Sequence, residues 1–421
     1  MSRLKVYSRL AFLFSLYYYI VLLPWQVKWL PITLGIMLTG LFWLLETDFK
    51  SKFKTLIVNR YAWLLFLSYG FVLIGSFYTS EPNQAHKELF SKIPLIVWPL
   101  LLGSKKMYPE KTMRQIFRLF IFSAVLLVIG SFGFAIYRYF QTANPEVFYF
   151  SELLVLSKVP PHYLGMYVTF AYALLLYHLL RGSPFFKGSW TNIIILVLLA
   201  LAVIFIWVRM QYLLFIIVNA YILVQYLKAK RGLKVALASL ASLVVAFSLL
   251  LVAIPGSRSR LVDTYHELRS FEQMIENKQT NPRKFLWREG FKVIGENFWW
   301  GVGTGSENTA LNQKLEKVDA IFWDGSQTYQ LHEMKFNYHN SFLQVFAANG
   351  IFAFLIFVAI LILPFFGSAH HPYRTELRIF LILSILSFFT ESMLQRQAGV
   401  LFFTFFYSLL VLQRMPKEIR K

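Results

Sequence analysis

Residues 339–366 read HNSFLQVFAANGIFAFLIFVAILILPFF, a polar pair followed by a run that holds no charged side chain. A helix of about 20 apolar residues is long enough to cross the hydrocarbon core of a bilayer. The run from Ser341 to Phe366 is therefore predicted to be a transmembrane helix. His339 and Asn340 are predicted to lie at its water-facing start, because Asn and Ser are favoured residue types at a helix N-terminus.

Comparable apolar runs recur along the whole chain. Of the 421 residues, 57% are hydrophobic and 15% are charged, whereas a soluble domain has about 25% charged residues. The sequence therefore predicts an all-α fold, a polytopic transmembrane helical bundle of about twelve spans with one large periplasmic loop that contains short helices. The predicted spans are residues 10–23, 29–45, 61–78, 89–102, 116–139, 163–180, 193–208, 212–227, 235–254, 341–366, 379–394 and 400–412.

Lysine and arginine concentrate in every second predicted loop, and the positive-inside rule places such loops in the cytoplasm. Both chain ends are then expected on that side, with the first span retained as a helix rather than cleaved as a signal peptide. Three parts follow from this topology. They are transmembrane helices one to nine in residues 1–254, a periplasmic loop subdomain in residues 255–340, and helices ten to twelve with a cytoplasmic tail in residues 341–421.

The composition also excludes several classes of partner and cofactor. The net charge of +21 is explained by the cytoplasmic loops, and no basic stripe with interleaved aromatic residues indicates nucleic acid. The chain has no cysteine, so disulfides and thiolate metal sites are excluded. His332 and Glu333 lack a second histidine at the spacing of a zinc site, because that position is Phe336. We therefore predict neither a metal nor another cofactor.

The long insert is expected to contain short amphipathic helices over residues 259–276 and 284–296, with a break at residues 279–282. Gly301, Gly303 and Gly305 follow, at a spacing that does not fit a dinucleotide-binding fingerprint. We interpret these glycines as a tight backbone turn whose amides are available to an anion.

Histidines at the expected outer helix ends are candidate catalytic bases. His339 is the strongest, because the positive end of the following helix dipole favours the neutral imidazole that can accept a proton. The alternative is that His339 only caps the helix together with Asn340. His162, after a pair of prolines, is a weaker candidate at another helix entry.

Cationic side chains near the same face are candidate ligands of a phosphate group, since charge in a bilayer is costly unless it reaches water or an anion. The candidates are Arg209, Arg283, Arg288 and Lys92. Arg283 and Arg288 are five residues apart on one predicted helix and cannot both face one point, and Arg283 is our first choice. The structural alternatives are interfacial anchoring for Arg209 and Lys92 and a solvated helix face for the other two.

Glu391 and Arg396 lie at a further outer helix end and are candidate supporting residues. A structural ion pair is the favoured interpretation of Glu391, with pairing to a base from elsewhere in the chain as the alternative.

Three motifs together resemble the O-antigen ligase and polymerase superfamily. They are Arg283-Lys-Phe-Leu-Trp287, Asn297-Phe-Trp-Trp-Gly301-Val-Gly-Thr-Gly305 and His339-Asn-Ser-Phe-Leu-Gln344. The resemblance extends from about Arg283 to Phe357 and is looser around Arg209. Two positions depart from the family pattern: Val208 stands where serine is usual, and Phe298 where proline is common.

The resemblance implies a bacterial integral-membrane enzyme of the inner membrane whose active site faces the periplasm. Such enzymes transfer a glycan from an undecaprenyl-diphosphate carrier to an acceptor hydroxyl, without a metal. By analogy, Arg209 and Arg283 would hold the diphosphate and His339 would be the base. We expect O-antigen ligation to lipid A–core, with an O-antigen polymerase or a protein glycosyltransferase as alternatives. A lipid-linked glycan transporter ranks lower, because the polar residues gather at helix ends and not at mid-span.

Overall fold

The computed structural model describes residues 3–27, 31–259, 262, 282–318, 321–323, 328–367 and 371–413, which are almost wholly helical. The first part contains α1 (Arg3–Leu22), α2 (Ile32–Leu45), α3 (Phe49–Ile57), α4 (Arg60–Gly75), α5 (Pro82–Lys92), α6 (Pro94–Gly103), α7 (Glu110–Thr142), η1 (Pro145–Phe148), α8 (Phe150–Leu153), α9 (Pro161–Leu180), α10 (Ser189–Phe205), α11 (Arg209–Arg231) and α12 (Leu233–Ala253). The second part contains α15 (Pro282–Glu296), α16 (Glu307–Glu316), β1 (Ile321–Trp323), β2 (Thr328–Gln330), α17 (Ser341–Gly367), α18 (Arg374–Thr390), η2 (Met393–Gln395) and α19 (Gln397–Leu410).

Within the described residues, each predicted apolar run falls mainly on helix, and several of these helices suit a bilayer. Among the described residues, five are long and apolar enough to cross a membrane: α7, α9, most of α11, α12 and α17. A sixth is added if α2 and α3, which are bent by 115° at a short break, form one span. The protein therefore has the helices of a membrane protein, and the count of twelve crossings stays a prediction.

Three local features differ from the sequence interpretation. The predicted span over residues 89–102 is broken into α5 and α6 at Pro94, which has no amide to continue a helix. The basic segment after α2, expected as a loop, forms the amphipathic helix α3. The insert also contains a two-stranded antiparallel hairpin, in which Ile321 faces Gln330. Most of the helix predicted over residues 259–276 lies outside the described residues.

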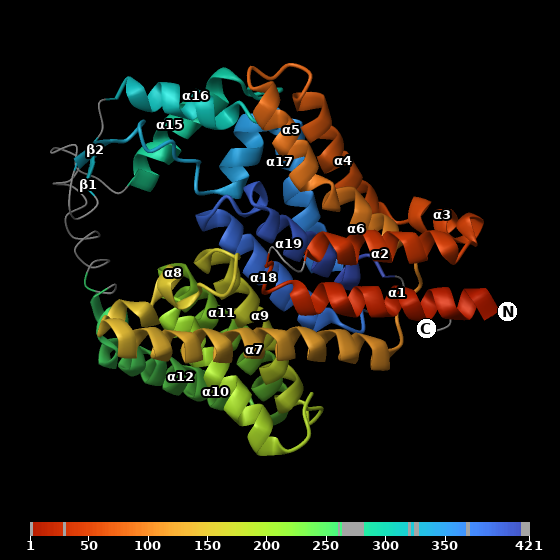
Figure 1. Ribbon diagram of the computed structural model, residues 1–421, viewed down its shortest axis with the longest axis vertical. Coiled ribbons are helices and arrows are strands. Elements are labelled where there is room, and N and C mark those ends of the chain that lie inside the picture. The colour runs from red at the N-terminus through yellow and green to blue at the C-terminus, as the bar shows by residue number, and fades with distance from the viewer. Residues whose placement is uncertain are drawn as a thin grey trace.

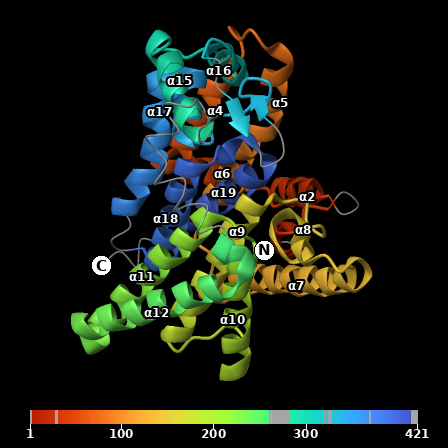
Figure 2. The same cartoon turned by 90° about the vertical axis from the view of Figure 1, so that its left-hand side faces the viewer.

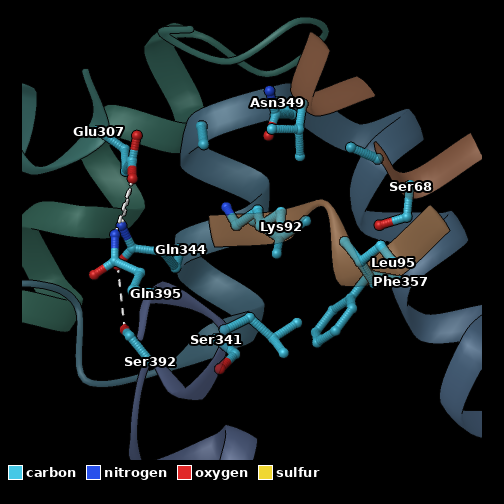
Figure 3. A pocket seen from close by; sticks show the side chains of 15 residues that line it. Ser68, Lys92, Leu95, Glu307, Ser341, Gln344, Asn349, Phe357, Ser392 and Gln395 are labelled. Atoms are coloured by element: carbon cyan, nitrogen blue, oxygen red, sulfur yellow. Dashed lines mark hydrogen bonds between the residues drawn. The ribbon is translucent and has the colours of Figure 1, made fainter. Parts of the chain in front are cut away.

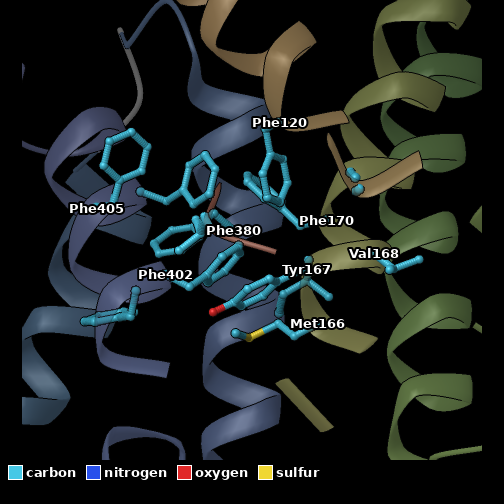
Figure 4. Close-up of a cluster of buried hydrophobic side chains, with 14 of the residues drawn as sticks. Phe120, Met166, Tyr167, Val168, Phe170, Phe380, Phe402 and Phe405 are labelled. Carbon is cyan, nitrogen blue, oxygen red and sulfur yellow. The ribbon is translucent and has the colours of Figure 1, made fainter. Parts of the chain in front are cut away.

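An aromatic core holds together α7, α9, α18 and α19, and the ends of the last three carry His162, Glu391 and Arg396 (Figure 4). Phe120 of α7, Phe170 of α9, and Phe380 and Phe402 of α18 and α19 pack ring against ring. Tyr167 stacks on Phe402 with ring centroids 4.3 Å apart, and its hydroxyl donates to the Ala398 carbonyl at 2.6 Å. This packing fixes the N-terminus of α9 relative to the segment between α18 and α19.

The insert has its own small core and sits at one end of the molecule. Leu286, Leu311, Leu315, Tyr338 and Ala347 are buried together between α15, α16 and the start of α17. Both views show α15 and α16 beside α4, α5 and α17 at one end of the long axis (Figures 1 and 2). The insert thereby brings its residues next to the N-terminus of α17.

Four glycines allow the backbone of the insert to pack closely against the helical bundle. Gly301, Gly303, Gly305 and Gly350 all have positive φ. A Cβ on Gly350 would lie 2.1 Å from the Trp299 carbonyl oxygen, so only glycine fits this contact. Gly350 also interrupts the helical geometry of α17, with φ 75° and ψ −173°.

The expectation that the amides of this glycine turn are available to an anion is wrong for most of them. The amides of Gly301 to Thr304 donate to protein carbonyls: those of Asn297, Ala347, Ala348 and Gly75, at 2.9 to 3.1 Å. The physical reason is that the turn packs backbone against backbone on α4 and α17, so the neighbouring main chain satisfies its donors. The turn therefore positions the insert rather than a ligand.

Candidate active site

A histidine–carboxylate pair joins the start of α17 to the end of α18. The Nδ1 atom of His339 lies 2.9 Å from Oε2 of Glu391. The Glu391 side chain is 12% exposed and that of His339 is 27% exposed. One member of the pair is therefore held inside the protein while the other reaches the surface.

The backbone around this pair is fixed by short polar side chains. Asn340 caps α17, because its Oδ1 accepts from the amides of Phe342 and Leu343 at 2.9 and 3.1 Å. Ser341 donates from Oγ to the Glu391 carbonyl and accepts from the Met393 amide, both at 2.9 Å. His339 itself has a left-handed φ of 43°. These bonds lock the helix start and the turn after α18 into one unit.

The electrostatics of Glu391 show which side chains share its surroundings. Burial acts to raise the pKa of Glu391, but the hydrogen bond from His339 and the positive charges of His339, His162 and Arg283 outweigh burial. The pKa of this carboxyl therefore lies below its usual value. An ionised carboxylate can only accept, so the proton of this hydrogen bond belongs to Nδ1 of His339, and Nε2 is the nitrogen that can accept a proton when the ring is neutral.

Arg209 begins α11 next to the N-terminus of α9. It follows a tight turn at Trp207, which has φ 61° and donates from its indole to the Gly256 carbonyl. Gln211, in the same first turn of α11, donates from Nε2 to the carbonyl of His162 at 3.1 Å. A Cβ on Gly165 would lie 2.6 Å from Gln211, so glycine permits this close approach of the two helices. The structure thus brings the first turn of α11, which contains the half-buried Arg209, against the first turn of α9, which contains His162.

Arg283 and Arg288 of α15 have different surroundings. Arg288 contacts the buried Glu289 from Nε at 2.8 Å, and its side chain is 50% exposed. Arg283 is half-buried and acts electrostatically on Glu391. Trp287 connects α15 to the residue before His339, because its indole donates to the carbonyl of Tyr338 at 3.0 Å. The structure therefore brings Arg283, and not Arg288, toward the His339–Glu391 pair.

Lys92 and Arg396 have surroundings that differ from those of Arg283. The Lys92 ammonium is 2.8 Å from Oε2 of Glu88, and the lysine side chain is 15% exposed. Arg396 is exposed at the N-terminus of α19. Lys92 thus faces a carboxylate of its own helix, and Arg396 faces the surface.

The family comparison covers the part of the chain that carries Arg209, Arg283 and His339. Residues 194–358, from α10 into α17, match the family model described as O-antigen ligase. This part of the chain belongs to the O-antigen ligase family. No curated protein matches the chain. The matched segment of the O-antigen ligase family ends before Glu391, so the carboxylate of the pair is supplied from outside it.

A buried polar network lies behind the pair and joins the matched segment to the turn after α18 (Figure 3). Oε1 of Glu307 accepts from Gln344 and Gln395 at 2.8 and 3.0 Å. Oε1 of Gln344 accepts from Ser392 at 3.2 Å, and the Ser392 amide donates to Oε1 of Glu391 at 3.1 Å. The network therefore runs from Glu307 to the carboxylate that holds His339.

A small cavity of about 30 Å³ lies against this network and is also lined by Lys92. That volume holds one or two water molecules, since a water needs roughly 10–15 Å³ of such space. Burial and the nearby Glu88 carboxylate raise the pKa of Glu307. Sequence reasoning missed Glu307 and Gln395, because nothing local marks them. Gln344, in contrast, ends the motif that starts at His339.

The described residues contain no group of three or more histidine or carboxylate side chains arranged to hold a metal ion. The chemistry that these residues can perform is proton transfer at Nε2 of His339 and stabilisation of an anion by the guanidinium groups nearby.

Proposed function

We propose that this protein transfers a glycan from an undecaprenyl-diphosphate carrier to an acceptor hydroxyl at the periplasmic face of the bacterial inner membrane. O-antigen ligation to lipid A–core is the reaction that we favour. The observation that carries the proposal is the hydrogen-bonded His339–Glu391 pair with Arg283 and His162 in its electrostatic surroundings. The family match supports the general reaction class.

In the proposed reaction, the acceptor hydroxyl loses its proton to Nε2 of His339 as its oxygen bonds to the anomeric carbon of the donor. The bond between that carbon and the diphosphate oxygen breaks, and undecaprenyl diphosphate leaves with the electron pair. Glu391 orients the imidazole through Nδ1 and stabilises the imidazolium that forms. A base in this position typically accelerates such a step by about 10²–10⁴-fold.

Negative charge develops on the leaving diphosphate, and pre-placed guanidinium groups stabilise it. We assign this role to Arg283, which acts on the Glu391 carboxylate, and to Arg209, which begins α11 beside His162. A guanidinium suits the role because its planar fork can donate two hydrogen bonds to one phosphate. Lys92 and Arg288 receive no part in it, because each faces a glutamate.

The test is reconstitution of the purified protein in liposomes with an undecaprenyl-diphosphate-linked glycan and one of two acceptors. Glycan on lipid A–core, with release of undecaprenyl diphosphate, is the expected result. A lengthened lipid-linked glycan would instead identify a polymerase, the second reaction that the family match allows. Transfer to neither acceptor would contradict the proposal.

A matched pair of variants on α15 tests the diphosphate assignment. Arg283→Ala is expected to raise the KM for the lipid-linked donor at least tenfold. Arg288→Ala is expected to leave that KM within about twofold, because Arg288 contacts Glu289, which keeps Lys292 at 2.9 Å in the variant. Equal effects of the two substitutions would refute the assignment of Arg283.

A further inference from the structure

A second polar cleft lies between α5, α16 and the chain that leads to His339. Its volume is about 470 Å³, which falls in the range of roughly 300–1,000 Å³ typical of small-molecule sites. Four of its lining side chains are amides: Gln84, Asn308, Asn312 and Gln313. The mechanism proposed above uses none of them.

The walls of the cleft are joined directly to one another. Thr309 of α16 donates to Oε1 of Glu81, at the start of α5, at 3.1 Å. Ser306 bonds through its hydroxyl to Thr79 at 2.6 Å and accepts from the Ser80 amide at 2.9 Å. These contacts connect residues far apart in the sequence, so the cleft is formed before any ligand binds.

One lining residue holds an acceptor without a partner. The Nδ2 group of Asn312 donates to the Asn308 carbonyl at 2.7 Å. Its Oδ1 atom is buried and has no hydrogen-bond partner within the described residues. A buried acceptor left in this state costs free energy, which a turn of the Asn312 side chain toward a ligand hydroxyl in the cleft would recover.

The lining selects a neutral, hydroxyl-rich ligand. Amide groups both donate and accept, as sugar hydroxyls do. The cleft residues include the carboxylates Glu81 and Glu316 against the single lysine Lys335, a balance that disfavours a diphosphate. They include no large apolar side chain, which disfavours a lipid tail. A carbohydrate is the ligand class that fits all three observations.

The cleft also lies close to the chain that carries the proposed base. Lys335 stands four residues before His339, and Oδ1 of Asn308 accepts from Gln344, in the first turn of α17, at 3.0 Å. Both views show α5 and α16 at the same end of the long axis, beside α17 (Figures 1 and 2). A glycan bound in the cleft would therefore lie on the side of the molecule where His339 precedes α17.

We infer that the cleft between α5 and α16 binds the glycan of the acceptor, with Asn312 and Gln313 as specificity-determining residues. This inference rests on the proposed function. Lipid A–core and a second lipid-linked repeat both present carbohydrate at this point, and the experiment separates them.

The test uses full-length protein in detergent and two soluble probes: core oligosaccharide freed of lipid A, and the oligosaccharide repeat freed of its diphosphate lipid. Saturation-transfer NMR is expected to show one of them bound to the wild-type protein. Asn312→Leu and Gln313→Leu are each expected to weaken that binding about 3- to 10-fold, the effect of one lost hydrogen bond. Lys314→Ala, on the same helix but paired with Glu296, is the matched control and should bind normally.

In the transfer assay, the same two leucine variants are expected to raise the KM for the acceptor with little change in kcat or in the KM for the donor. Wild-type binding and KM in both variants would overturn the inference, as would a change confined to the donor. Gln313 is exposed, so its replacement tests the cleft even if Asn312→Leu unfolds the protein.

His339→Ala separates this inference from the proposed function. It is expected to abolish transfer while the oligosaccharide still binds. Binding in the cleft together with full transfer by His339→Ala would overturn the catalytic assignment and leave a glycan-binding cleft.

Discussion

Glu391 and Glu46 are buried to the same extent but differ in the side chains that their carboxylates bind. Glu46, after α2, is 8% exposed, and both its oxygens contact the Lys105 ammonium, at 2.6 and 2.7 Å. Lys52 adds a second ammonium at 3.6 Å. Over the whole residue, Glu391 is 9% exposed. Its carboxylate accepts from one ring nitrogen of His339 and from the amide of Ser392.

The difference lies in the partner and not in the carboxylate. Both partners of the Glu46 carboxylate are lysine ammonium groups, and that of Lys105 also lies over the Phe12 ring, 3.4 Å from its centroid. This ionic cluster joins α1, α2, α3 and the end of α6. Glu391 instead binds one nitrogen of a partly exposed imidazole, and the second nitrogen has no hydrogen bond to the described part of the chain. We therefore assign a structural role to the Glu46 carboxylate and a role in catalysis to the Glu391 carboxylate. Substitutions at these two sites should have opposite effects on stability and on transfer rate.

The largest effect is expected for His339→Ala. Transfer should fall by about 10²–10⁴-fold, because the proposed base is lost, while the free energy of unfolding should fall by only about 1.5 kcal/mol, for the one hydrogen bond to Glu391. The measurement is initial transfer rate in liposomes at equal amounts of folded protein. His86→Ala, at an exposed histidine of α5, is the control. A rate within threefold of wild type would remove His339 from catalysis.

Glu46→Ala should show the opposite pattern. It leaves two buried ammonium groups without their carboxylate, and breaking a buried pair costs about 3–5 kcal/mol of unfolding free energy. The measurement is the midpoint of thermal unfolding in detergent, with the exposed Lys50→Ala of α3 as the control. The rate per folded molecule should match the wild type, and a selective loss of rate would contradict the structural role.

Glu391→Gln should lower the transfer rate by about 10²-fold, less than removal of the base itself. A glutamine amide can donate to Nδ1, which would move the ring proton to Nε2 and leave no base facing the acceptor. Thermal unfolding of the same variant distinguishes this from a structural defect, because the protein should stay folded while its rates stay low across the whole pH range. Full activity at any pH would show that the carboxylate is dispensable.

The smallest effect is a pH-dependent difference in stability between the same two proteins. A carboxyl whose pKa is lowered by folding stabilises the fold above its unfolded pKa of about 4.3, and this is lost as the pH falls through the folded value. Wild type should therefore be more stable than Glu391→Gln by about 1.5 kcal/mol at pH 7. Unfolding midpoints between pH 3 and 7 should converge toward the acidic end. A constant difference would mean that ionisation of Glu391 is not involved.

The sequence predicted the helices well, because apolar runs and proline or charged breaks are local features. The run from Ser341 to Phe366 lies on α17, and the capping role of Asn340 follows from its residue type. The turn of Gly301 to Gly305 was located correctly, but the use of its amides depended on packing against α4 and α17. That packing involves residues from distant parts of the chain, and no local pattern encodes it.

The candidate site shows the same limit. His339 and Arg283 stand out locally as polar residues beside apolar runs, and the motifs around them were recognisable. The partnership of His339 with Glu391 spans 52 residues, and Glu307 joins it only through Gln344 and Ser392. Such pairings arise from helix packing, so sequence reasoning left Glu391 between a structural and a catalytic interpretation.

The most direct test of the central claim is a structure of the protein with undecaprenyl diphosphate bound, determined by cryo-electron microscopy in lipid. The account predicts that the diphosphate lies within hydrogen-bond distance of both Arg209 and Arg283, with Nε2 of His339 facing the same space. A diphosphate bound elsewhere, or held by only one of these two arginines at a distance from His339, would contradict it.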